Sequence, residues 1–117
     1  MSKEYDLEER TLIFSENLLD LVKKIPKNVT TSSLIDQLIR SGTNIGSNYR
    51  EANGASSKKD FKNKIYICKK EAKETMYWIR LIVKVNPEVK DESRILWKEA
   101  YELTKIFSKI VSTINKN

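Results

Sequence analysis

Hydrophobic residues recur every three or four positions in four segments of this chain, a spacing that only an α-helix turns into a continuous face. The pattern predicts helices over about residues 6–25, from Thr30–Ser33 to Asn53, 58–85 and 88–115. The predicted core positions, in chain order, are Leu7, Phe14, Leu18, Leu21, Val22, Ile25, Leu34, Ile35, Leu38, Ile39, Ile45, Tyr49, Phe61, Ile65, Cys68, Ala72, Thr75, Met76, Ile79, Ile82, Ile95, Leu96, Leu103, Ile106, Phe107, Ile110 and Ile114.

Residues that start and stop helices flank each segment. Short polar side chains cap exposed amides at a helix start, and proline or glycine ends a helix. The predicted start signals are Asp6, the hydroxyls of Thr30–Ser33, a capping box over Ser57–Asp60, and Asn86 or Asp91; the predicted stop signals are Pro26, Asn53–Gly54 and Asn86–Pro87.

The run SGTNIGSN, residues 41–48, interrupts the second helical segment with weak helix formers. A loop is one interpretation. We favour a continuous helix, because Ile35, Ile39, Gly42, Gly46 and Tyr49 share one side. Two glycines four residues apart let a neighbouring helix approach closely. A phosphate-binding loop is disfavoured, since the Gly-Lys-Ser/Thr ending of that motif is missing.

Four helices with short connections favour antiparallel neighbours. The sequence therefore predicts an all-α, up-down-up-down four-helix bundle, with residues 1–117 forming a single domain. The composition agrees, since 39% of residues are hydrophobic, 32% are charged and only three are glycine.

Residue types that carry most enzyme chemistry are scarce. The chain has no histidine and one cysteine, Cys68, which removes Cys/His zinc sites, histidine-based triads and an internal disulfide. Cys68 is interpreted as a small core residue. We expect no enzyme activity, no cofactor and no metal. The first ten residues lack a signal-peptide layout and no apolar run reaches membrane-spanning length, so we expect a cytoplasmic protein without membrane contact.

Two pairs of glutamates three residues apart were weighed as acid or metal sites: Glu71 with Glu74, and Glu99 with Glu102. Two carboxylates on one helix turn are able to share a proton or hold a metal. The favoured interpretation is salt bridges along the helix surface. The expected partners are Lys69, Lys73, Lys98 and Lys105.

A basic stripe runs along the third segment. Between Lys58 and Lys84 lie nine Lys or Arg and three Asp or Glu, a net charge of +6 that equals that of the whole protein. On a helix, most of these cations and two tyrosines fall within one arc of about 100°. The predicted nucleic-acid-binding residues are Lys59, Lys62, Tyr66, Lys69, Lys70, Lys73, Tyr77, Arg80 and Lys84. A cationic face with aromatic rings is typical of polyanion contact, and a solvated helix face is the alternative.

Apolar residues also lie off the predicted core line of three helices. A monomer rarely leaves such patches bare, so we expect self-association. The alternative is a broad core that absorbs some of them. The predicted oligomer interface consists of Leu12, Leu19, Ile67, Trp78, Leu81, Val85, Trp97 and Tyr101.

The segment 34–83 contains residues that are common individually but stand in a characteristic order. They are Arg40, Ile45, Asn48 and Glu51, then Ser57-Lys58-Lys59-Asp60-Phe61, with Glu71 and Glu74 downstream. In this order they resemble the 23S rRNA intervening-sequence family of small bacterial four-helix bundles. Gly46 and Ser47 stand where many members carry Pro-Ser, which is a departure in the second helix.

The resemblance implies an antiparallel bundle that assembles into a ring, commonly a pentamer, with no established enzymatic activity. Some members are encoded within insertions in rRNA genes. A similar bundle is the nucleic-acid-binding accessory partner of a reverse transcriptase in diversity-generating retroelements.

Two functional hypotheses follow. The first is a non-catalytic homo-oligomer that binds the backbone of RNA or DNA through the basic face of the third helix. Specificity would be low, because no helix-turn-helix, RNA-recognition sheet or zinc finger is visible. The second is a scaffold or accessory subunit whose apolar patches bind a protein partner while the lysines keep it soluble.

Overall fold

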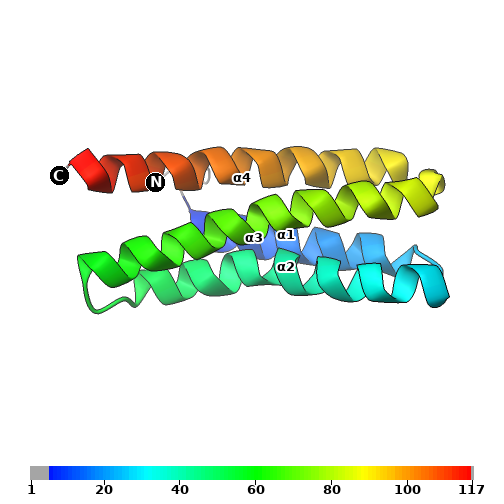
Figure 1. Ribbon diagram of the computed structural model, residues 1–117, viewed down its shortest axis with the longest axis horizontal. Coiled ribbons are helices and arrows are strands. Elements are labelled where there is room, and N and C mark those ends of the chain that lie inside the picture. The colour runs from blue at the N-terminus through cyan, green and yellow to red at the C-terminus, as the bar shows by residue number, and fades with distance from the viewer. Residues whose placement is uncertain (1–5, 117) are drawn as a thin grey trace.

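The computed structural model describes residues 6–116. It contains α1 (Leu7–Lys23), α2 (Val29–Asn53), α3 (Lys58–Val85), a 3₁₀ turn η2 (Pro87–Val89) and α4 (Lys90–Lys116). The chain reverses direction at each connection, so consecutive helices run antiparallel (Figure 1). The predicted all-α four-helix bundle is confirmed, and no strand occurs between residues 6 and 116.

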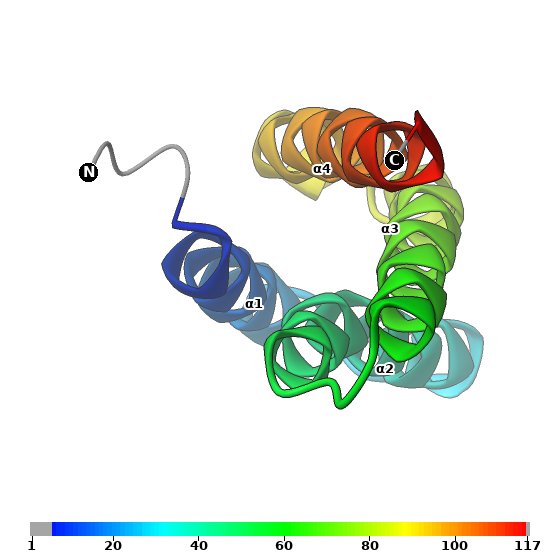
Figure 2. The ribbon, with the colours of Figure 1, turned by 90° about the vertical axis from the view of Figure 1, so that its left-hand side faces the viewer.

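The helices follow one another around an open arc in the end view (Figure 2). α3 packs closely against α2 on one side and α4 on the other, whereas α1 and α4 touch little. Two ion pairs link these outer helices: Arg10 to Glu99 at 2.7 Å and Lys24 to Glu92 at 3.1 Å. The arrangement leaves α3 as a central helix with one long face turned outward.

The helix ends agree with the predicted signals at Asp6, whose carboxylate accepts from the Glu9 amide at 3.1 Å, and at Gly54, which follows the last residue of α2. The predicted capping of α2 by a hydroxyl is confirmed at Thr31, whose hydroxyl accepts from the Asn28 amide. The N-cap residue lies outside the predicted run: it is Asn28, whose side chain accepts from the Thr30 and Thr31 amides. Helix α2 therefore begins before the predicted hydroxyl run.

The other two starts are simpler than predicted. The Ser57 hydroxyl accepts from the Asp60 amide at 3.0 Å, but among the described hydrogen bonds Asp60 does not return the second bond of a capping box. Neither Asn86 nor Asp91 caps α4 through its side chain within the described chain; instead the turn η2, which starts at Pro87, leads directly into it.

Helix α2 is continuous through residues 41–48, as predicted. Gly42 and Gly46 are both buried beneath α1. A Cβ at Gly42 would overlap Cδ1 of Leu18, and one at Gly46 would lie 3.0 Å from Oγ1 of Thr11. The interpretation of the glycines as packing residues is confirmed, because their missing side chains let α1 approach α2.

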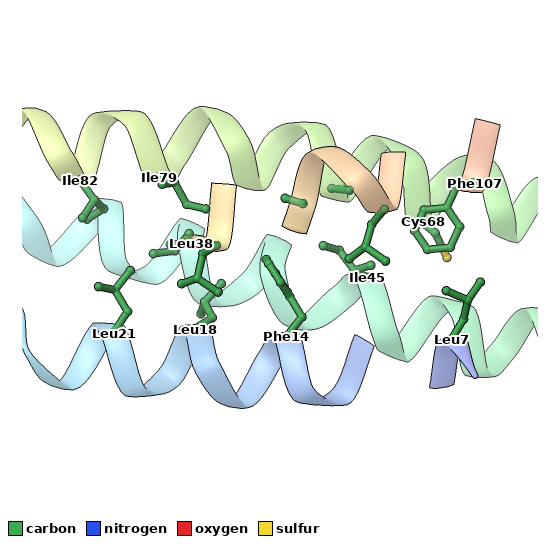
Figure 3. Packing of buried hydrophobic residues seen from close by; sticks show 14 of the residues in the cluster. Leu7, Phe14, Leu18, Leu21, Leu38, Ile45, Cys68, Ile79, Ile82 and Phe107 are labelled. Atoms are coloured by element: carbon green, nitrogen blue, oxygen red, sulfur yellow. The ribbon is translucent and has the colours of Figure 1, made fainter. Parts of the chain in front are cut away.

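The core runs the length of the bundle, with all four α-helices contributing (Figure 3). Most predicted positions are buried, including Leu18, Leu38, Ile45 and Phe107 at 1% exposure or less. Ile95 is the clear error, since 70% of it is exposed. It lies on the flank of α4 that points toward the loosely packed α1, where it lines an open pocket between the two helices.

Cys68 is fully buried, as predicted. Burial raises the pKa of its thiol to about 12, because the apolar surroundings disfavour the thiolate. The nucleophilic form is therefore suppressed at neutral pH.

Candidate nucleic-acid interface

The basic stripe of α3 lies on the outward face of that helix. Five of its seven predicted cations are exposed: Lys59, Lys70, Lys73, Arg80 and Lys84. The two predicted tyrosines accompany them, with Tyr77 59% exposed and Tyr66 44% exposed. The helix thus presents charge and aromatic rings on one surface.

Lys62 and Lys69 are less free than predicted, because both are half-buried. Nζ of Lys62 donates to Oδ1 of Asn115 at 2.8 Å, which ties the first half of α3 to the end of α4. The cause is the close packing of α4 on this side of α3, which the helix periodicity alone does not reveal.

None of the seven stripe cations forms an ion pair with a carboxylate in the described chain. Two acids of α3 form their ion pairs with another helix instead. Glu71 and Glu74 bind Arg40 of α2 at 3.2 and 2.8 Å, so the predicted partners Lys69 and Lys73 are wrong. The positive charge of the outward face is left uncompensated, which strengthens its field toward an anion.

The second glutamate pair is divided between two partners. Glu99 receives two hydrogen bonds from Arg10 of α1, at 2.7 and 2.9 Å, rather than pairing with Lys98. Glu102 pairs with Lys105 at 2.8 Å, as predicted. Within residues 6–116, no group of three or more metal-binding side chains comes together.

Arg40, Glu71 and Glu74 form a charged cluster between α2 and α3, with Glu71 buried. The hydrogen bond from Arg40 lowers the pKa of Glu74 below its ordinary value of 4.5. A lowered carboxyl pKa stabilises the fold above the unfolded-state pKa, and this contribution is lost as the pH falls through the folded-state pKa. The contribution of this cluster to the free energy of unfolding is therefore lost at acid pH.

We expect Arg40→Gln to be less stable than the wild type at pH 7, with the difference shrinking as the pH falls below about 4.5 toward protonation of Glu74. Urea unfolding at several pH values measures this difference in the free energy of unfolding. Lys109→Gln is the control, because exposed Lys109 has no described ion pair. A difference between Arg40→Gln and wild type that stays constant with pH would contradict the cluster's role.

The predicted oligomer residues divide into two groups. Leu12, Leu19, Val85 and Tyr101 are exposed. Ile67, Trp78, Leu81 and Trp97 are half-buried, and both tryptophans pack against the core. The core therefore absorbs part of the predicted patch, which is the broad-core alternative for the two tryptophans.

Sequence analysis missed three cations of α4: Lys90, Arg94 and Lys98. They recur every four residues, a helical spacing that was available as a signal. The structure places them beside Arg80 and Lys84 of α3, where all five line one groove. The basic surface therefore extends from α3 onto α4.

No described helix is both long enough and apolar enough to cross a membrane. A comparison with curated proteins gives no match. Among solved structures, the chain is similar to a protein of unknown function from the S23 ribosomal protein family of Bacteroides thetaiotaomicron. The two share 31% sequence identity with a TM-score of 0.78, and the alignment covers 89% of this chain and 96% of that one.

The family described as 23S rRNA-intervening sequence protein matches residues 3–109, nearly the whole chain. The match includes the ordered residues from Arg40 to Glu74 and the outward basic face of α3. The chain belongs to the 23S rRNA-intervening sequence protein family.

Proposed function

We propose that this protein is a non-catalytic oligomer that binds the backbone of RNA or DNA through the basic face of α3. The observation that carries the proposal is the uncompensated charge of that face: its exposed lysines and arginine have no described carboxylate partner, although acids on the same helix do pair with arginine. Phosphates are the anions that such a surface attracts without reading sequence.

The exposed rings of Tyr66 and Tyr77 support a contact with single strands, since any base has a face that is able to stack on an aromatic ring. Tyr77 also meets Trp78 edge to face, with ring centroids 5.0 Å apart. An exposed ring between cations is suited to hold a base beside its phosphate.

The test is a salt titration of the binding of labelled single-stranded RNA and DNA, followed by fluorescence anisotropy. For single strands the log–log slope is about −0.7 per neutralised phosphate, so replacing three contacting lysines should reduce its magnitude by about two. The test variant is Lys59→Gln/Lys70→Gln/Lys73→Gln, whose lysines are all exposed.

The matched control is Lys23→Gln/Lys27→Gln/Lys109→Gln, which removes the same charge from exposed sites outside α3. An equal change of slope in both variants would mean that only net charge matters. A wild type without salt-sensitive binding near about 50 mM salt would contradict the proposal. That second result would favour the scaffold function below.

The exposed apolar side chains favour a second candidate, a protein-interaction scaffold or accessory subunit. They also support self-association, and family resemblance suggests a pentamer.

Leu12 and Leu19 form the clearest pair of such side chains, since both are exposed and lie on the same side of α1. Light scattering at micromolar concentration tests assembly: Leu12→Gln/Leu19→Gln should lower the mass, whereas equally exposed Ile13→Gln on the opposite flank should not. A monomeric wild type would contradict self-association.

A further inference from the structure

A groove of about 770 Å³ lies between the second half of α3 and the first half of α4. Five cations line it: Arg80, Lys84, Lys90, Arg94 and Lys98. Among the residues that the structure describes, no aspartate or glutamate lines it. Along each helix the cations stand four residues apart, so each helix contributes one row to the groove.

This arrangement is unfavourable without an anion. Like charges four residues apart on a helix repel each other, and here two such rows flank the same groove. None of the five forms an ion pair with a carboxylate of residues 6–116. The nearby acid Glu92 is bound at 3.1 Å to Lys24, which follows the last residue of α1, and the acids Glu88 and Asp91 do not line the groove. A bound anion would offset the repulsion.

Ser93 supplies a second, independent observation. It belongs to the groove lining and its side chain is fully buried, yet its hydroxyl has no hydrogen-bond partner among residues 6–116. Serine in a helix often donates to the carbonyl four residues earlier, as Ser108 does to Thr104 at 2.8 Å. Ser93 does not make this bond, and a buried polar group without a partner costs stability unless a water or a ligand satisfies it.

Trp97 adds an aromatic surface one turn along α4 from Ser93. Its ring is half-buried in the same lining and lies nearly parallel to that of Tyr101, at 16° with centroids 5.7 Å apart. The stacked pair holds the indole in place. The groove therefore combines cations, a buried serine and an aromatic ring within one site.

We propose that this groove binds a nucleotide, with the phosphate among the cations beside Ser93 and the base against Trp97. Arginine and serine are common donors to phosphate oxygens, and a tryptophan ring stacks on any base. The inference rests on the proposed nucleic-acid binding and deepens it, since it places one nucleotide between α3 and α4. The shared chemistry is a sugar phosphate that carries a base, either as a free nucleotide or within a strand.

The experiment follows the tryptophan fluorescence and the indole N–H resonances of the full chain during titration with adenosine 5′-monophosphate, adenosine, ribose 5-phosphate and a single-stranded oligoadenylate. We expect both the nucleotide and the oligonucleotide to perturb the signals of Trp97. If the natural ligand is a strand rather than a free nucleotide, the oligonucleotide should do so at the lower concentration. Ribose 5-phosphate should bind more weakly and adenosine should have no effect. The signal should be lost in Trp97→Phe and kept in Trp78→Phe.

Arg94→Gln/Lys98→Gln should weaken nucleotide binding by about tenfold or more, because charged hydrogen bonds to phosphate are lost. The control Lys109→Gln/Lys116→Gln removes equal charge from α4 outside the groove. Equal loss in both variants, or equal competition by polyglutamate, would overturn the inference. If the α3 triple variant loses RNA binding while the groove variant does not, the proposed function stands and this inference fails. If only the groove variant loses it, the binding site lies here rather than on the outward face of α3.

Discussion

Phe107→Ala is expected to lower the free energy of unfolding by about 3–5 kcal/mol, the usual cost of deleting a buried aromatic ring. Phe107 of α4 is fully buried, and its ring centroid lies 6.2 Å from that of Tyr49 of α2. Figure 3 shows it at the same end of the core as Cys68 and Leu7. The ring therefore bridges helices that do not follow each other in the chain, and its loss leaves a cavity between them.

Urea unfolding at one protein concentration measures this loss. Ile95→Ala is the control on the same helix, because 70% of Ile95 is exposed and little contact is removed. The control should change stability by less than about 0.5 kcal/mol. Similar losses in both variants would mean that α4 is not packed as described.

Gly42→Val is expected to cost about 1–3 kcal/mol, although valine is a better helix former than glycine. Even a single added carbon at Gly42 overlaps Cδ1 of Leu18, which is itself fully buried. Either the Leu18 side chain must leave its place in the core or the α1–α2 contact must widen. Gly54→Ala is the control, because a Cβ there meets only a backbone oxygen at 3.7 Å.

A double-mutant cycle tests whether Leu18 and a side chain at position 42 compete for the same space. Leu18→Ala alone should cost about 2–5 kcal/mol through the cavity it leaves. Combined with Gly42→Val, the loss should be smaller than the sum of the two single losses, because the valine occupies space that the leucine vacates. Additive losses would show that the two side chains do not share one site.

On the surface of α3, the periodicity of the sequence predicts which side chains are exposed but not which residues they contact. Angular position along the helix predicts correctly that Lys59, Lys70 and Lys73 face outward. It does not predict that Lys62 bonds Asn115, a residue 53 positions away. Periodicity describes one helix at a time, whereas the partner of a long flexible side chain depends on the neighbouring helix and its register.

The same distinction applies to the acids. Spacing suggests partners on the same helix, and this is right for Glu102 with Lys105. Glu71, Glu74 and Glu99 instead bind arginines on other helices. An arginine fork that reaches across an interface offers two directed bonds, which compete well with an exposed lysine one turn away.

By itself, the sequence determined the four helices, their ends to within a few residues and most of the buried face, because these depend on hydrophobic spacing and local capping. It also determined the close approach at Gly42 and the family to which the chain belongs. Only the tertiary structure decided that Ile95 is exposed, that Arg40 gathers Glu71 and Glu74, and that the cations of α3 and α4 share one groove. Those features depend on the angle and register between helices, which arise from packing along the whole bundle rather than from any one segment.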